Sequence, residues 1–129
     1  MLYDPNWAVP ATEIKLEPWQ EILLHAVNLL ERHGWVQHNY GSTYMGFCTI
    51  GAVETAGWAL YRSYRRHLAD GARMERPPSS AAAESRTASA LGKVRKAIQS
   101  DDIAGWNDHP CRDKYEVINL LRKVATDAI

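Results

Sequence analysis

Residues 47–61, FCTIGAVETAGWALY, constrain the fold more than any other segment of the chain. The segment carries only one charged side chain, Glu54, so a helix built from it has no polar side to turn toward water. Such a helix must be covered by other elements, and we expect it to be the centre of a small domain. One side of it consists of small residues, which predicts that a partner helix approaches closely: Cys48, Ala52, Thr55, Ala56 and Ala59.

Helical periodicity predicts the elements around this segment. Apolar residues at helical spacing indicate a first helix from about Pro18 to His33, which Gly34 ends. The central helix runs from about Cys48 to His67, and a thinner helix is indicated around residues 91–98. Asp113, with Glu116 three residues later, predicts the start of a last helix. Since no long stretch alternates with period two, we predict an all-α compact bundle of about four helices, with a short hairpin near residues 35–47.

A chain of 129 residues has the length of one domain. We expect an extended arm over residues 1–15 and a single helical domain over residues 16–129, with a flexible segment near residues 70–85, where PPSS follows an arginine-rich stretch. Lys+Arg and Asp+Glu number 15 each, which excludes a general attraction to nucleic acid or anionic membrane. No apolar run approaches a membrane span, and MLYDPNWAVP lacks the pattern of a secretory signal, so a cytoplasmic location is predicted.

Cys48 is the first candidate for chemistry. A thiol at a helix start can act as a nucleophile when a histidine activates it, and His38 and His109 are both available in predicted loops. The catalytic candidates are therefore Cys48 as the nucleophile, a loop histidine such as His109 as the base, and Asp108 as the residue that orients it. The alternative is that Cys48 is a small buried hydrophobic residue. Glu54 lies about 120° away from Cys48 on an ideal helix, where it either binds a ligand or is satisfied by a structural hydrogen bond.

Residues 101–110, DDIAGWNDHP, give the strongest loop signal. Asn107 and Asp108 next to Trp106 predict a polar cluster over a cleft, although both residue types also form turns for purely conformational reasons. His109, Cys111, Cys48 and His38 lack the paired spacing of a zinc site, so neither a metal nor a cofactor is predicted.

An excess of arginine lies between residues 62 and 76. It predicts contact with phosphate or an acidic partner through Arg62, Arg65 and Arg66, or else a solvated helix end. No helix-turn-helix spacing supports specific reading of nucleic acid.

Four short motifs occur in a recognisable order: Gly34-Trp35, the CTIGA segment from Cys48, Trp106-Asn107-Asp108, and EVINLLRKVA near the C-terminus. In these motifs and their order, the chain resembles a family of small domain-of-unknown-function proteins from actinobacteria and their phages, over roughly residues 18–128. The resemblance implies a compact, mostly helical, cytoplasmic protein. It implies no activity and no site residues.

The favoured interpretation is a small binding or regulatory module, associated with phages or prophages, that contacts a protein or a small ligand. An enzyme is not favoured. Aromatic side chains in the loops and the polar cluster form its predicted contact surface: Trp35, Tyr40, Tyr44, Glu54, Trp106, Asn107 and Asp108. One alternative is a cysteine-dependent hydrolase or transferase with Cys48 as nucleophile. The other is a binder of nucleic acid or phosphate ligands that uses the arginines.

Overall fold

The computed structural model describes residues 15–69 and 80–127 as a predominantly helical fold with one small hairpin. Residues 1–14 of the expected arm lie outside the described residues, as do residues 70–79 of the segment expected to be flexible, while residues 80–85 of that segment belong to a helix. The helices are α2 (Pro18–His33), α3 (Thr49–Ala69), α4 (Ser80–Ile98), α5 (Ile103–Asn107) and α6 (Lys114–Thr126). The hairpin pairs β1 (Gly41–Ser42) with β2 (Gly46–Phe47) in antiparallel register. The prediction of an all-α bundle is confirmed, and the short α5 is an additional helix in a segment that we expected to be a loop.

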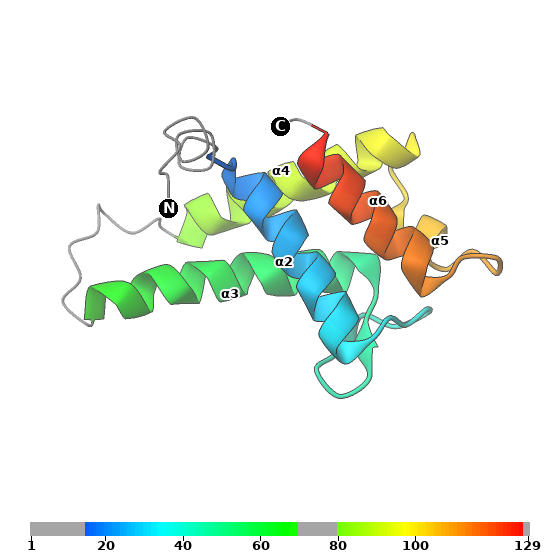
Figure 1. Ribbon diagram of the computed structural model, residues 1–129, viewed down its shortest axis with the longest axis horizontal. Coiled ribbons are helices and arrows are strands. Elements are labelled where there is room, and N and C mark those ends of the chain that lie inside the picture. The colour runs from blue at the N-terminus through cyan, green and yellow to red at the C-terminus, as the bar shows by residue number, and fades with distance from the viewer. Residues whose placement is uncertain (1–14, 70–79, 128–129) are drawn as a thin grey trace, which may run out of the picture.

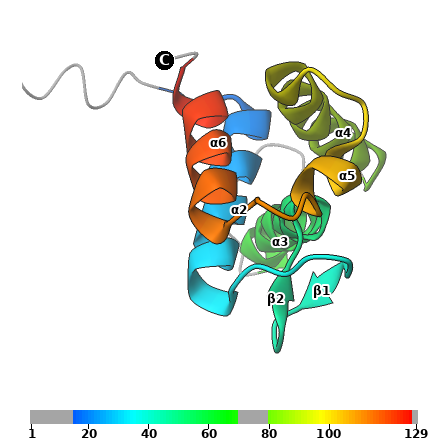
Figure 2. The same cartoon turned by 90° about the vertical axis from the view of Figure 1, so that its right-hand side faces the viewer.

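The helices form two layers. Figure 1 shows α2 and α6 side by side and running in opposite directions across α3 and α4. Turned by 90°, the same arrangement has α5 at the end of the bundle, near the start of α3 and the hairpin (Figure 2). The largest fully buried side chains come from both layers and from α5, and include Leu23, Leu30, Val53, Val94, Ile103 and Leu121. One core therefore joins all five described helices.

The ends of α2 and α6 follow from local chemistry. Pro18 occupies the first turn of α2, and the Glu17 amide donates to Gln20 Oε1 at 2.7 Å. Gln20 Nε2 then donates to the carbonyl of Ala125 at 2.8 Å, which ties the start of α2 to the end of α6. Asp113 accepts the Glu116 amide at 2.9 Å, as its sequence position predicts. The Glu116 carboxylate binds Arg112.

The central helix α3 does have an exposed side, contrary to the expectation from its apolar sequence. Ala52, Val53 and Ala56 are fully buried, but Trp58 is 40% exposed and Arg62 is also exposed. Since α2 and α4 cover only part of the helix, some of its apolar residues meet solvent. Close packing does occur, but at Gly57, which is not one of the small residues named above: a Cβ atom there would lie 2.0 Å from Thr87 Oγ1 of α4.

Candidate functional site

Asn107, the last residue of α5, joins three segments of the chain. Its side chain is almost completely buried. Its Oδ1 accepts hydrogen bonds from Trp35 Nε1 at 2.7 Å and from the amide and hydroxyl of Thr49 at 2.9 and 2.7 Å. Its Nδ2 donates to the Val36 carbonyl at 3.1 Å. The Asn107 amide therefore fixes α5 against both the loop before the hairpin and the first residue of α3.

Asp108 continues this network toward the surface. Its Oδ1 accepts the backbone N–H of His38 at 2.8 Å and Nδ2 of Asn107 at 3.0 Å. Its Oδ2 lies 3.6 Å from Nδ1 of His38, whose ring is 74% exposed. The hydrogen bond from the His38 backbone, followed by that from Asn107, lowers the pKa of Asp108 below its ordinary value. The carboxylate is consequently charged at neutral pH and faces an imidazole.

A pocket of about 280 Å³ opens beside this network. The loop before the hairpin contributes His38 and Tyr40, the start of α3 contributes Cys48 and Ile50, and α5 with the residue after it contributes Ala104 and Asp108. Asn107 also borders the pocket, so the buried hydrogen bonds support one of its walls. Segments that are distant in sequence thus create one open, partly apolar site. Another hollow, between α2, α3 and α4, measures about 20 Å³, and two more open hollows on α4 and α2 measure about 540 and 470 Å³.

Cys48 precedes α3 and acts as its cap. Its Sγ accepts the backbone N–H of Gly51 at 3.3 Å, and its own backbone N–H donates to the Tyr40 carbonyl at 3.2 Å. The thiol is free and partly exposed, and it borders the pocket together with His38 and Asp108. Cys48 is therefore not enclosed in the core, and it lies at the same site as the residues after Trp106.

Glu54 does not border this pocket but supports its rim. The Tyr40 hydroxyl donates to Glu54 Oε1 at 2.9 Å. Burial of the phenol, together with this hydrogen bond and the negative charge of Glu54, raises the pKa of Tyr40 to about 12. Tyr40 therefore remains neutral and oriented over a wide pH range.

Trp35, in the loop after α2, and Trp106, in α5, are only partly exposed. Trp35 is half-buried and donates its indole N–H to Asn107. Trp106 is also half-buried, and the Arg112 guanidinium lies 4.0 Å from the centre of its ring while Arg112 Nε donates to the Trp106 carbonyl at 2.9 Å. His109 is exposed and accepts the Cys111 backbone N–H through Nδ1 at 3.1 Å. His109 is not among the residues around the pocket, so His38 is the loop histidine that accompanies Cys48.

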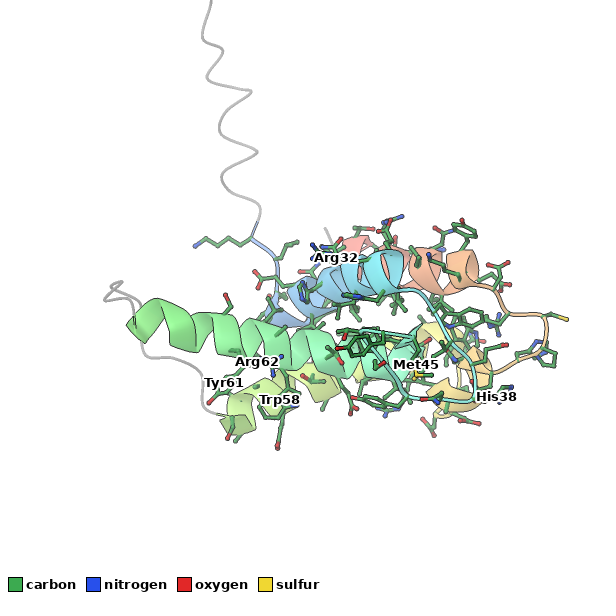
Figure 3. All side chains as sticks on the ribbon, turned by 90° about the horizontal axis from the view of Figure 1, so that it is seen from below. Arg32, His38, Met45, Trp58, Tyr61 and Arg62 are labelled. Atoms are coloured by element: carbon green, nitrogen blue, oxygen red, sulfur yellow. The ribbon has the colours of Figure 1, made fainter. Side chains whose placement is uncertain are left out.

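The hairpin turn presents the most exposed aromatic side chain of the described residues. Tyr44 is 99% exposed, and Tyr40 and Met45 are each 50% exposed. In Figure 3, His38 and Met45 lie toward one end of the molecule, while Trp58, Tyr61 and Arg62 lie farther along α3. The side chains of Arg65 and Arg66 are outside the described part of the structure, so the predicted arginine patch is represented there by Arg62.

The sequence interpretation missed Thr49, Val36 and Arg112, which support this site. Thr49 follows Cys48 directly, yet nothing local indicates that its hydroxyl meets a residue 58 positions away. In the described residues, no group of three or more His, Cys, Asp or Glu side chains is placed to hold a metal ion. No helix in the same part of the chain is long and apolar enough to cross a membrane.

The sequence model of DUF6197, described as a family of unknown function, matches residues 15–127. The match includes all five described helices and the hairpin. Searches of curated proteins and of solved structures returned no match.

Proposed function

The chain therefore belongs to this family of unknown function, and we propose that it is a small binding module that contacts a protein partner through its hairpin. We place this contact in the bacterial cytoplasm, or in the host cytoplasm for a phage-encoded member. The motif order described above motivates the phage or prophage association. Catalysis is not required for this role.

The exposure of Tyr44 carries the proposal. Tyr44 is 99% exposed, although its backbone N–H and that of Met45 both donate to Ser42 Oγ, at 3.2 and 3.3 Å. The turn is therefore ordered while its aromatic side chain contributes nothing to the core. Tyrosine offers a large contact area with few rotatable bonds, and it is enriched among the residues that dominate binding energy.

The base of the hairpin supports the same interpretation. Gly41 and Gly46 both have positive φ angles, and a Cβ atom at Gly41 would lie 2.1 Å from the Gly46 carbonyl oxygen. Phe47 donates its backbone N–H to Gly34, and Val36 donates to Phe47, at 3.0 and 3.1 Å. A loop that is fixed before binding loses less conformational entropy when a partner docks. The hairpin can thus present Tyr40, Tyr44 and Met45 in one prepared arrangement.

Trp35, Trp106, Asn107 and Asp108 have a supporting role in this proposal. The indole of Trp35 and the amide of Asn107 hold the loop, and Arg112 covers Trp106. Glu54 orients Tyr40 through its hydroxyl. These residues therefore contribute to binding by fixing the hairpin, while the direct contact belongs to the exposed turn.

A photocrosslinking residue placed at position 44 tests the proposal in cells that naturally contain the protein. The matched control is position 115, because Tyr115 is 71% exposed and belongs to α6, not to the hairpin. We expect position 44 to capture a discrete protein that position 115 does not capture. Tyr44→Ala should then weaken copurification of that protein at least about tenfold, as loss of a binding hot spot does, while Tyr115→Ala should not.

The proposal fails if both positions give the same crosslinked products, or if Tyr44→Ala leaves copurification unchanged. Thermal unfolding of the two variants should match that of the wild type within about 0.5 kcal/mol, because both tyrosines are exposed. A loss of binding without a loss of stability therefore separates contact from folding.

A further inference from the structure

The pocket beside the hairpin brings together three groups with complementary chemistry. Cys48, His38 and Asp108 all border it, although they come from the start of α3, the loop before the hairpin and the residue after α5. The Asp108 carboxylate, which accepts the His38 backbone N–H, lies 3.6 Å from Nδ1 of the same residue. An Nδ1–H of His38 would face this carboxylate, and Nε2 would then be the nitrogen able to accept another proton.

The start of α3 adds donors for negative charge. The Gly51 N–H donates to Cys48 Sγ at 3.3 Å, and such a donor solvates a thiolate when one forms. The Thr49 N–H is taken by Asn107, whereas the Ile50 N–H has no acceptor among residues 15–69 and 80–127. Ile50 itself borders the pocket. An unpaired backbone N–H next to a nucleophile is suited to a developing oxyanion.

From this juxtaposition we propose that the pocket is an acyl-transfer site, with Cys48 as nucleophile, His38 as general base and acid, and Asp108 as the positioning residue. The substrate class is a small ester or thioester. Ile50, Ala104 and the Tyr40 ring give the pocket an apolar wall for the acyl group, and its volume of about 280 Å³ suits a short chain. This inference does not rest on the proposed protein contact at Tyr44.

The reaction has two balanced steps. His38 takes the proton of Cys48, the sulfur attacks the acyl carbon, and the C–S bond forms as the bond to the leaving group breaks; His38 returns the proton to the departing alkoxide or thiolate. Water then loses a proton to His38 and attacks the thioester. The C–S bond breaks, the acid is released, and the sulfur recovers its proton from His38.

The test uses the purified full-length chain with p-nitrophenyl butyrate, and mass spectrometry to locate the butyryl group. The chain provides its own control, because Cys111 is an exposed thiol that does not border the pocket. We expect butyrylation of Cys48 with a burst of p-nitrophenolate equal to the protein concentration. Cys111→Ser should keep the burst and Cys48→Ser should abolish it, while serine retains an oxygen that can cap α3.

His38→Asn distinguishes a catalytic base from a merely reactive thiol. Asparagine tolerates the positive φ of 62° at this position, and the His38 ring is largely exposed, so the fold should be retained. We expect acylation to slow by about 100-fold, with an unchanged thermal unfolding curve. The inference is overturned if Cys48 is not acylated, if it reacts no faster than Cys111, or if His38→Asn acylates at the wild-type rate.

Discussion

Around Asn107 the molecule is joined by hydrogen bonds between polar groups, whereas α3 and α4 are joined by close contact between small side chains. Asn107 makes hydrogen bonds to residues 58 to 72 positions away in the sequence. At the other interface, Gly57 allows Thr87 to approach the α3 backbone. Both contacts bring distant segments together, but the first depends on matching donors with acceptors and the second on volume.

This difference determines how each region tolerates change. A buried polar group that loses its partner keeps the full cost of its desolvation, so the Asn107 network should be sensitive to removal of a single amide. A packed interface is sensitive to added volume, which neighbouring side chains can partly accommodate. The pocket borders the hydrogen-bonded region around Asn107. Its geometry therefore depends on hydrogen bonds that a single substitution can remove.

Replacing Asn107 should have the largest effect. Asn107→Ala leaves the Trp35 indole N–H and the Thr49 amide and hydroxyl without their acceptor, and we expect it to lower the free energy of unfolding by about 3 kcal/mol. Urea unfolding measures the change. Asn119→Ala, at an exposed position of α6, is the control and should stay within about 0.5 kcal/mol of the wild type. Equal effects of the two substitutions would contradict the role given to Asn107.

Added volume at Gly57 should have the next largest effect. In Gly57→Ala the new Cβ would lie 2.0 Å from Thr87 Oγ1 and 3.2 Å from Thr87 Cβ, so the Thr87 side chain or one of the helices must move, at a cost of about 2 kcal/mol. Gly92→Ala is the matched control on α4, because nothing lies within 4 Å of the added atom. There the better helix propensity of alanine should stabilise by about 0.5–1 kcal/mol. Opposite signs in thermal unfolding are the expected result, and equal signs would count against close packing at Gly57.

Unfolding measured at acid pH should show how much the ionised Asp108 carboxylate stabilises the fold. Hydrogen bonds from the His38 backbone and from Asn107 lower its folded pKa. A carboxyl with a lowered folded pKa stabilises the fold above its unfolded pKa, and this contribution is lost as the pH falls through the folded value. Asp108→Asn keeps an acceptor but removes the titration, so its stability should fall less steeply below about pH 4. Urea midpoints measured from neutral pH to pH 3 check this, and coincident acid slopes would refute it.

The smallest expected effect is a change in the pKa of Tyr40, at the rim of the pocket. Burial, together with the hydrogen bond and charge of Glu54, raises the pKa of Tyr40 to about 12. The resulting stabilisation is present below about pH 10 and is lost as the pH rises through the folded pKa. Glu54→Gln retains an acceptor and removes the charge, so NMR titration of the Tyr40 ring should show a lower pKa. An unchanged value would mean that burial alone accounts for the shift.

Several features of the fold could be predicted from the sequence because each depends on residues that are close together along the chain. Pro18 and Gly34 mark the bounds of α2, Asp113 marks the start of α6, and the glycines of residues 35–47 indicate the hairpin. Cys48 was correctly placed at the start of the central helix. Turns, caps and helical periodicity depend on residues only a few positions apart, so a single sequence is enough to indicate them.

The site was predictable only in its components. Trp106, Asn107 and Asp108 were recognised as a polar cluster, but Asn107 turned out to be buried and to bond Trp35 and Thr49. The segment of α5 was predicted to be a loop because Asn107 and Asp108 are of types that form turns. In the structure Asp102 caps a short helix there by accepting the Gly105 amide at 2.8 Å. The same residue types serve turns and caps, so composition alone does not separate them.

The sequence by itself determined a helical bundle, its main helix ends and a helix built for close packing at residues 47–61. Only the tertiary structure decided that this helix keeps an exposed side and that Glu54 accepts a hydrogen bond from the Tyr40 hydroxyl. It also decided that Cys48 borders the same pocket as His38 and Asp108. The physical reason is that periodicity and capping act within a few residues, while burial and hydrogen-bond pairing depend on which distant segments the folded chain brings together.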